Sequence, residues 1–209
     1  MMLVKKTVRS FISELASDSA APGGGSASAL TGCLAAALTK MVCNLSLDEK
    51  KFKEALPEIK TICEQASILL ERLISAVDED ANAFNEVMNA YKLPKTTEEE
   101  KGIRLETIQN SLKKASLMPL TVAGDCLEAL KLSQQILPIG NPNAVSDAAV
   151  AGLMAYAAVQ GALCNVKINL GFIKDAEFVN ETRELINEIN AESKKENAAM
   201  EAAISKIFS

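Results

Sequence analysis

The chain has 209 residues, of which 48% are hydrophobic, and this length and composition suit one domain with a sizeable core. Its formal net charge of -5 argues against nucleic-acid binding. The absence of histidine excludes His-based catalytic triads, His metal ligands and imidazole proton shuttles, so that acid–base chemistry would depend on a carboxylate, Lys, Tyr or Cys.

Helical periodicity of apolar residues runs through the chain, and no alternating strand pattern with hairpin turns is found. We therefore expect an all-α fold, with residues 1–209 forming a single domain of about six helices, two of them long. The third helix begins near Glu49 or at Pro57, and Pro119 is expected to break or kink the fourth. The expected helices cover residues 8–16, 26–45, 49–91, 98 to the turn at 140, 146–170 and 175–207.

Two of these helices are rich in small residues, repeated at intervals of about four, which lets two backbones approach closely. We expect these two helices to lie centrally and to pack against each other. The residues are Gly25, Ala29, Cys33 and Ala37 in one helix, and Ala148, Gly152, Ala157 and Gly161 in the other.

The five cysteines form no CxxC pair and lie in apolar helical stretches. This pattern predicts buried free thiols in a reducing compartment, hence a cytoplasmic protein. The apolar stretch from Ser26 to Leu47 contains Lys40, Asn44 and several hydroxyl groups, which favours a buried helix over a membrane span.

One carboxylate lies on the apolar face of the helix that ends near Tyr91. Apolar side chains recur at helical spacing from Leu70 onward, and Asp80 falls inside this stripe, between Leu73 and Val87. Burial of an unpaired carboxylate raises its pKa, which suits a general acid or base. An acidic helix face, or a structural hydrogen bond, would also explain the position.

The run Pro22-Gly23-Gly24-Gly25-Ser26 opens directly into a small-residue helix. Its backbone N–H groups could face a carboxylate or a ring carbonyl, although a tight turn between helices explains the glycines as well. It is not a Walker loop, because no Gly-Lys-Ser/Thr follows. Lys40 and Asn44 share a face with Ser26, and Lys40 either binds a carboxylate or extends to solvent.

The segment Gly140-Asn141-Pro142-Asn143 predicts a turn, with Asp147 in the first turn of the next helix. Helix capping accounts for Asn143 and Asp147, but not for two asparagines on either side of a proline. Asp147, Asn165 and Asn169 share one face of that helix, where amides need hydrogen-bond partners. Structural and binding interpretations both stay open here.

Taken together, three segments resemble one family in order and spacing over nearly the whole chain: PGGGSASALTGCLAAALTKMVCNLS, DEDANAFNEVMNAYKLP and GNPNAVSDAAVAGLMAYAAVQGALCNVKINL. This is the formiminotransferase-cyclodeaminase C-terminal family. Its members are the cyclodeaminase domain of a bifunctional folate enzyme and free-standing bacterial methenyltetrahydrofolate cyclohydrolases. The chain resembles the free-standing form.

The resemblance implies an all-helical fold, a homodimer and a folate site lined by the three segments. Asp80 matches the Asp of the family's D-x-x-A-F segment, and Asp147 matches the acid of GNPN-x-x-S-D. We take these two as the catalytic candidates. From the resemblance and the shared helix faces, the expected substrate-binding residues are Gly23, Gly24, Gly25, Ser26, Lys40, Asn44, Asn141, Asn143 and Asn165.

The implied chemistry takes place at a one-carbon bridge of tetrahydrofolate. A cyclodeaminase closes 5-formiminotetrahydrofolate to 5,10-methenyltetrahydrofolate and releases ammonia, whereas a cyclohydrolase opens the methenyl bridge to 10-formyltetrahydrofolate. An aspartate can move the required proton and stabilise a cationic carbon. We expect the cyclodeaminase reaction, without metal, other cofactor, nucleic-acid or membrane partner. The cyclohydrolase reaction is the alternative, and a non-catalytic helical folate-binding or assembly module is the contrasting class.

Overall fold

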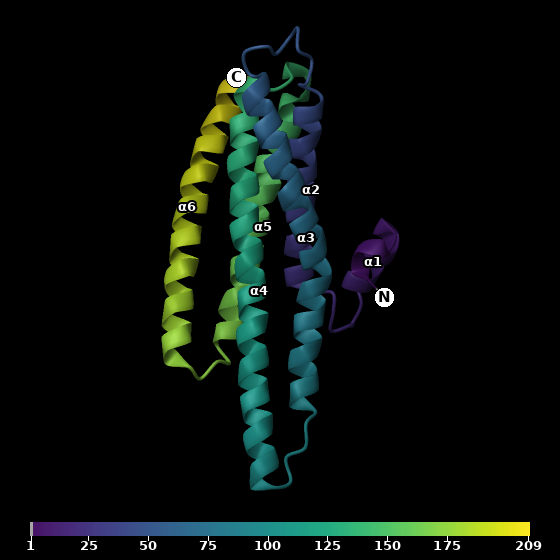
Figure 1. The fold of residues 1–209 in the computed structure, drawn as a ribbon, viewed down its shortest axis with the longest axis vertical. Helices are drawn as coiled ribbons and strands as arrows, with labels where there is room; N and C mark the ends of the chain where they lie inside the picture. The colour runs from purple at the N-terminus through teal and green to yellow at the C-terminus, as the bar shows by residue number, and fades with distance from the viewer. Residues whose placement is uncertain (1) are drawn as a thin grey trace.

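The computed structural model describes residues 2–209, which form long helices lying roughly along one axis (Figure 1). Within this range there are six α-helices, two short 3₁₀ helices and no strand, so the expected all-α fold is confirmed. Three helices are long rather than the expected two, with 36, 42 and 33 residues in α3, α4 and α6. The elements are η1 (Leu3–Lys5), α1 (Val8–Leu15), α2 (Gly24–Asn44), α3 (Leu56–Tyr91), α4 (Glu98–Ile139), η2 (Pro142–Ala144), α5 (Val145–Leu170) and α6 (Ala176–Phe208).

Local sequence signals explain where α3 and α4 begin. Pro57 lies in the first turn of α3, where its missing N–H has no helical partner to lose, and it therefore marks the start of the helix. A capping box opens α4, since Thr97 accepts from the backbone of Glu100 and the Glu100 side chain accepts from the backbone of Thr97. Of the expected break or kink at Pro119, the break is wrong, because α4 runs through this residue as one helix.

The helices α2 to α5 form the core, each antiparallel to the next, and α6 packs on α4 and α5. The predicted close packing of the two small-residue helices is confirmed, because α2 lies directly against α5. At one contact a Cβ added to Gly161 would lie 2.5 Å from the Ser28 hydroxyl oxygen. The absence of side chains there allows the two backbones to approach.

The lower ends of α3 and α4 extend beyond the ends of α2 and α5 (Figure 1). A small cluster holds this extension together, in which Val87 and Ala90 of α3 pack on Ile108 and Leu112 of α4. Below the first turn of α2, the extended ends of α3 and α4 continue, but α2 itself no longer fills the space beside them. This arrangement positions the site described below.

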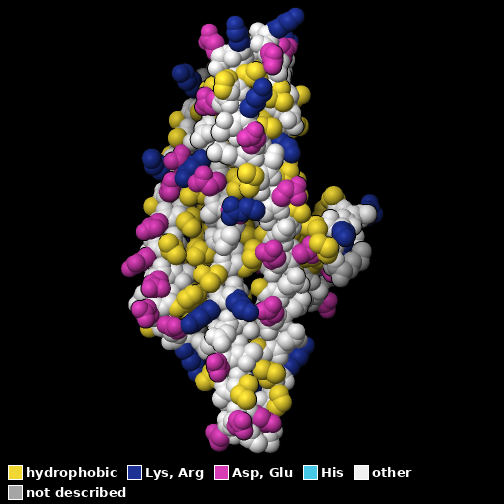
Figure 2. Space-filling view, in the orientation of Figure 1, with side chains coloured by type: hydrophobic (Ala, Val, Ile, Leu, Met, Phe, Trp, Pro, Cys, Tyr) yellow, Lys and Arg dark blue, Asp and Glu magenta, His cyan; other side chains and the backbone are white. Residues whose placement is uncertain are grey.

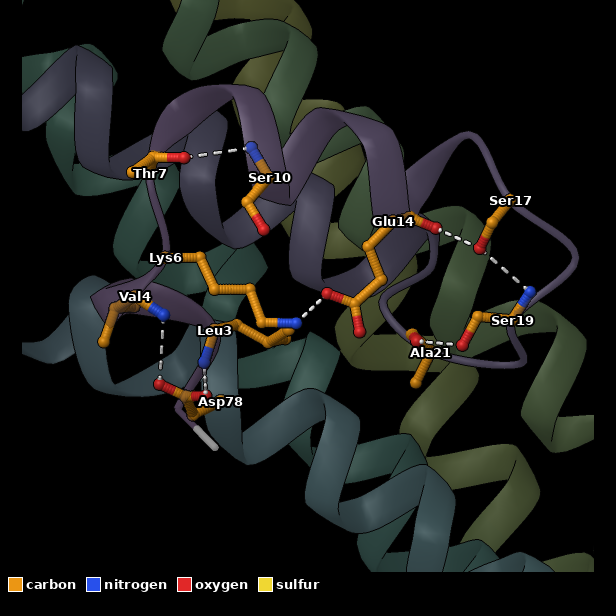
Figure 3. Close-up of polar contacts among 10 residues, drawn as sticks. All are labelled: Leu3, Val4, Lys6, Thr7, Ser10, Glu14, Ser17, Ser19, Ala21 and Asp78. Atoms are coloured by element: carbon orange, nitrogen blue, oxygen red, sulfur yellow. Dashed lines mark hydrogen bonds and ion pairs between the residues drawn. The ribbon is translucent and has the colours of Figure 1, made fainter.

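The N-terminal segment is held against α3 and leads to the glycine-rich turn (Figure 3). The Asp78 carboxylate accepts from the backbone N–H groups of Leu3 and Val4, and Lys6 pairs with Glu14 of α1. Hydrogen bonds within residues 14–21 then shape the loop that enters α2. The segment thus fixes the position of residues 20–25.

The cysteines are free thiols, and Cys33, Cys43 and Cys126 are buried as expected. Burial raises the pKa of the Cys33 thiol, and likewise that of Cys43, to about 12. Cys63 is half-buried and Cys164 is exposed on α5, so the expectation of burial is wrong for Cys164.

Candidate active site

A pocket of about 430 Å³ lies directly below the first turn of α2. Residues of α3, α4 and α5 form its walls, and the glycines 23–25 form its upper end. Its volume falls in the range typical of small-molecule sites, and its lining is mostly apolar. The large apolar side chains of the wall are Phe84, Met88, Tyr91, Leu112, Ile168 and Phe172.

Asp80 contributes the carboxylate of this pocket. The hydroxyl of Ser26 donates to its Oδ2 at 2.8 Å, and the backbone N–H of Ser26 also donates to the carboxylate. Both donors come from the first turn of α2, where N–H groups have no helical acceptor. The prediction that Asp80 lies within the apolar stripe of its helix is in accord with this geometry, and the structure places the glycine-rich turn beside it.

Burial raises the pKa of the Asp80 carboxyl group above its ordinary value, and the two Ser26 donors oppose this rise only in part. A second acid, which is buried, shows the contrast. Asp125 also has a raised pKa because of burial, but the Arg72 guanidinium lies 2.6 Å away and counteracts the shift. No ion pair among residues 2–209 involves Asp80. Asp80 is therefore the better candidate for a general acid or base.

The raised pKa of Asp80 predicts how stability depends on pH. In the unfolded chain the carboxyl group ionises near 3.8, and in the folded protein it ionises at higher pH, so the folded state binds more protons in between. The free energy of unfolding should therefore fall as pH rises through this window. Asp80→Asn lacks this dependence, so its stability relative to the wild type should increase from about pH 4 upward. Urea unfolding at a series of pH values measures the difference, and a difference that is constant with pH would contradict the assignment.

The glycines of the turn are needed for close contact with neighbouring side chains, and not for an unusual backbone conformation. Gly24 and Gly25 belong to the first turn of α2, which begins two residues earlier than expected. Among residues 2–209 no glycine has a positive φ. A Cβ on Gly25 would overlap the Asp80 carboxylate, and one on Gly24 would lie 3.3 Å from Nδ2 of Asn165. The glycines therefore let α2 approach the acid and the amide directly.

Two asparagines of α5 complete the polar part of the pocket. The Asn165 amide donates to the Gly161 carbonyl oxygen at 2.8 Å, and the Asn169 amide donates to the Ala115 carbonyl oxygen at 2.7 Å. Asn165 was expected from the sequence. Asn169 shares that helix face but is not among the predicted site residues, and its partner on α4 is distant in the sequence.

The remaining predicted residues lie at the opposite end of α2. The Asn141 side-chain NH₂ group donates to the Leu45 carbonyl oxygen at 3.0 Å. Its side-chain oxygen accepts from the backbone N–H of Asn143. The Asn141 backbone N–H also donates to Ser46 Oγ at 2.7 Å. A helix of 21 residues separates this end from the glycines by about 30 Å. The residues placed there are Lys40, Asn44, Asn141, Asn143 and Asp147.

All three segments contribute lining residues to this pocket, the third through Asn165 and Asn169, but the Asn141–Asp147 part of the third segment does not reach it within a single chain. The pocket brings together Asp80, the glycine-rich turn and Asn165, and leaves the Asn141–Asp147 segment at the far end. The physical reason is the length of α2 and α5, whose antiparallel packing places the two turns at opposite ends of the bundle. The roles of the distant residues stay predictions.

A family profile described as Formiminotransferase-cyclodeaminase matches residues 7–188. The chain belongs to this family. It is 38% identical over 192 residues to a methenyltetrahydrofolate cyclohydrolase of Methylorubrum extorquens, and the match covers 92% of each chain. Members of the family are thus enzymes of folate one-carbon chemistry, which confirms the resemblance seen in the three segments.

Two further relatives are named as cyclodeaminases. The chain is 34% identical to the formimidoyltransferase-cyclodeaminase of Gallus gallus, matching 98% of this chain and 38% of that protein. The crystal structure of a formiminotetrahydrofolate cyclodeaminase from Thermotoga maritima superimposes with a TM-score of 0.87 at 27% identity, covering 98% of both chains. The family accordingly includes both reactions.

Proposed function

We propose that this member of the family is a formiminotetrahydrofolate cyclodeaminase in which Asp80 is the acid–base residue. The observation that carries the proposal is a carboxyl group with a raised pKa, without a cationic partner, in an apolar pocket at a helix N-terminus. A protonated carboxyl group suits the departure of ammonia, which must leave as a neutral molecule after its nitrogen has been protonated.

The proposed reaction balances with proton transfers alone when the formimino group starts in its protonated amidinium form. N10 of the folate attacks the formimino carbon, forming the N10–C bond and giving a carbon bonded to N5, to a protonated N10 and to an amino group. The Asp80 carboxyl group protonates the amino nitrogen, the N10 proton passes to the Asp80 carboxylate, and the C–N bond to ammonia breaks as the methenyl bridge forms and keeps the positive charge. The attacking nitrogen is already held in the same molecule, so proximity supplies much of the rate and no positioned water, metal or further cofactor is needed.

The pocket walls support this assignment of roles. Phe84, Met88 and Tyr91 continue along α3 from Asp80 at helical spacing, and they offer an apolar surface on which flat rings can lie. The unpaired N–H groups of Gly24 and Gly25 border the same space. The site therefore combines one proton donor with a surface for an aromatic ligand.

Cyclohydrolysis of methenyltetrahydrofolate is the second candidate, and the 38% identity to a cyclohydrolase matched over 92% of its length favours it. That reaction needs a water held beside the methenyl carbon and a base to activate it. Within one chain Asp147 is too far from Asp80 to share this task. Cyclodeamination needs the single carboxyl group that the pocket contains.

Ammonia release is expected to tolerate Asp147→Asn better than Asp80→Asn. The reason is that only Asp80 lies in the pocket of the same chain, whereas Asp147 lies at the other end of α5. Ammonia and methenyl absorbance are measured together with 5-formiminotetrahydrofolate as substrate. Equal losses in both variants would contradict the assignment of a single proton donor. Folate binding without turnover by the wild type would indicate a non-catalytic binding module.

We further propose that the protein acts as a homodimer, joined through α2 and α5. Both helices are long and apolar enough to cross a membrane by length and composition, yet only 56% and 50% of these stretches is buried within the chain. Exposed apolar side chains follow one side of each helix. They are Leu34, Met41 and Leu45 on α2, and Val150, Leu153 and Ile168 on α5. The view in Figure 2 shows the opposite side, formed by α3, α4 and α6, where acidic and basic side chains are interspersed.

A two-fold axis perpendicular to α2 and α5 would pair the two copies in antiparallel fashion. The Asn141–Asp147 end of one copy would then lie beside the glycine-rich turn of the other, because the two turns are at opposite ends of the same helices. This arrangement would add the Asn141–Asp147 part of the third segment to the pocket of the partner copy. It also explains why the predicted site residues are divided between two ends of one chain.

Sedimentation equilibrium should therefore give twice the chain mass of 22.3 kDa at micromolar concentration. Leu34→Lys combined with Leu153→Lys places two charges in the proposed interface and should yield the monomer. Ile103→Lys is the matched control, since Ile103 is equally exposed but lies on α4. A 22.3 kDa species for the wild type, or an unchanged dimer in the double variant, would count against this interface.

A further inference from the structure

Pro119 leaves one backbone carbonyl of α4 without its helical partner. In an α-helix the carbonyl of residue i accepts from the N–H of residue i+4, and proline has no N–H, so the Ala115 carbonyl cannot be satisfied within α4. Both residues are buried, where an unpaired carbonyl is costly. The missing bond is supplied by α5, because Nδ2 of Asn169 donates to the Ala115 carbonyl oxygen at 2.7 Å.

This bond determines which way the Asn169 amide faces. A carbonyl oxygen only accepts, so the NH₂ group must point to Ala115 and Oδ1 must point away from it. Asn169 lines the pocket, and among residues 2–209 no donor is bonded to its Oδ1, which is not one of the buried unpaired atoms. Pro119 therefore holds a hydrogen-bond acceptor in a fixed orientation at the pocket wall.

A second acceptor lies one helical turn away on α5. The NH₂ group of Asn165 is bonded to the Gly161 carbonyl oxygen at 2.8 Å, which leaves Oδ1 of Asn165 free of any donor from the described residues. Side chains four residues apart lie about 5–6 Å from each other on a helix face. The α5 wall thus presents a pair of oriented acceptors, whereas the glycine-rich turn presents donors.

We propose that Asn169 accepts a hydrogen bond from a ring N–H of the folate and so selects the reduced pteridine over the fully oxidised ring, with Pro119 as the positioning residue. This proposal rests on the proposed function, because it takes a folate as the ligand. Reduction of the ring converts the lone pair of N8 into an N–H donor, and N8 stays unsubstituted in folates that carry their one-carbon group on N5. An oxidised ring would place a nitrogen lone pair against Oδ1 of Asn169. That oxygen would then have no donor, which weakens binding strongly.

Pro119→Ala tests the proposal, because it restores the N–H at position 119. Ala115 then bonds within α4, and the Asn169 amide loses the partner that orients it. The melting temperature should rise by about 3 °C or more, since an interior proline is lost from the helix. The Kd of 5-formyltetrahydrofolate, a stable reduced ligand, should increase about tenfold. The Kd of folic acid, whose ring is oxidised, should not increase, because the freed amide no longer holds its oxygen against the ring lone pair.

Pro138→Ala is the matched control, since Pro138 is the second proline inside α4 and does not line this pocket. It should change neither dissociation constant. Asn169→Leu removes the acceptor itself and should abolish the preference for the reduced ligand, whatever its effect on stability. The proposal is overturned if Pro119→Ala and Asn169→Leu leave the ratio of the two dissociation constants unchanged. It is also overturned if the wild type binds both ligands equally or binds neither.

These measurements use binding at equilibrium and do not depend on turnover. A wild type that prefers the reduced ligand but releases no ammonia would refute the cyclodeaminase proposal and leave the role of Asn169 standing. A wild type that releases ammonia, with unchanged ligand preference in both variants, would refute the role of Asn169 alone.

Discussion

Asp80→Asn is expected to lower turnover by about 10²- to 10⁴-fold, the usual contribution of a positioned acid–base group. The substitution keeps the shape of the side chain and an oxygen that can accept from Ser26, but it removes the group that carries the proton. The measurement is the initial rate of ammonia release from 5-formiminotetrahydrofolate, with ligand binding determined separately. Binding should change less than turnover, because the lost interaction acts on the reacting atoms.

Folding should survive this substitution. Asp80 is a half-buried acid without a cationic partner among the described residues, and replacing such a group with a neutral side chain often leaves stability unchanged or raises it. Glu79→Gln is the matched control, because Glu79 is the neighbouring carboxylate on the exposed face of α3. Near-normal turnover in Asp80→Asn, or an equal loss in Glu79→Gln, would contradict the catalytic assignment.

Gly25→Ala is expected to lower turnover by about 100-fold, because the added Cβ would occupy the position of the Asp80 carboxylate. The acid must then move away from Ser26 and from the pocket. Helix propensity itself favours alanine over glycine in the first turn of α2, so a loss of activity would not reflect a weaker helix. The rate of ammonia release and the circular dichroism spectrum are measured on the same preparation.

The control for this variant is Gly102→Ala, also in a helix, where a Cβ would meet nothing within 4 Å. It should raise stability by up to about 1 kcal/mol and leave the rate unchanged. If Gly25→Ala retains the wild-type rate, the contact between α2 and Asp80 is not needed for the reaction.

Much of the fold could be predicted from local signals in the sequence. Pro57 and the Thr97–Glu100 pair set the beginnings of α3 and α4 by backbone hydrogen bonding, which depends only on neighbouring residues. The position of Asp80 within an apolar stripe was also evident, since helical periodicity alone places it there. The pattern did not show that the lower part of this stripe, including Phe84 and Tyr91, lines a pocket rather than the core.

Other features of the site depend on contacts between distant segments, which periodicity does not reveal. The need for Gly25 comes from Asp80 on another helix, and the orientation of Asn169 comes from a proline 50 residues earlier in the sequence. The separation of Asp147 from Asp80 follows from the length and direction of α2 and α5. The two ends of the third segment thus lie at opposite ends of the bundle, and only the end with Asn165 and Asn169 reaches the pocket.

The most direct test of the account is to give the wild-type protein 5-formiminotetrahydrofolate and 5,10-methenyltetrahydrofolate in parallel, and to follow ammonia and methenyl absorbance together. The account predicts that the formimino substrate yields ammonia and methenyl absorbance in equal amounts, because the attacking nitrogen and the single proton donor suffice for ring closure. Rapid consumption of methenyltetrahydrofolate, with no ammonia from the formimino substrate, would contradict the cyclodeaminase proposal and establish the cyclohydrolase reaction in its place.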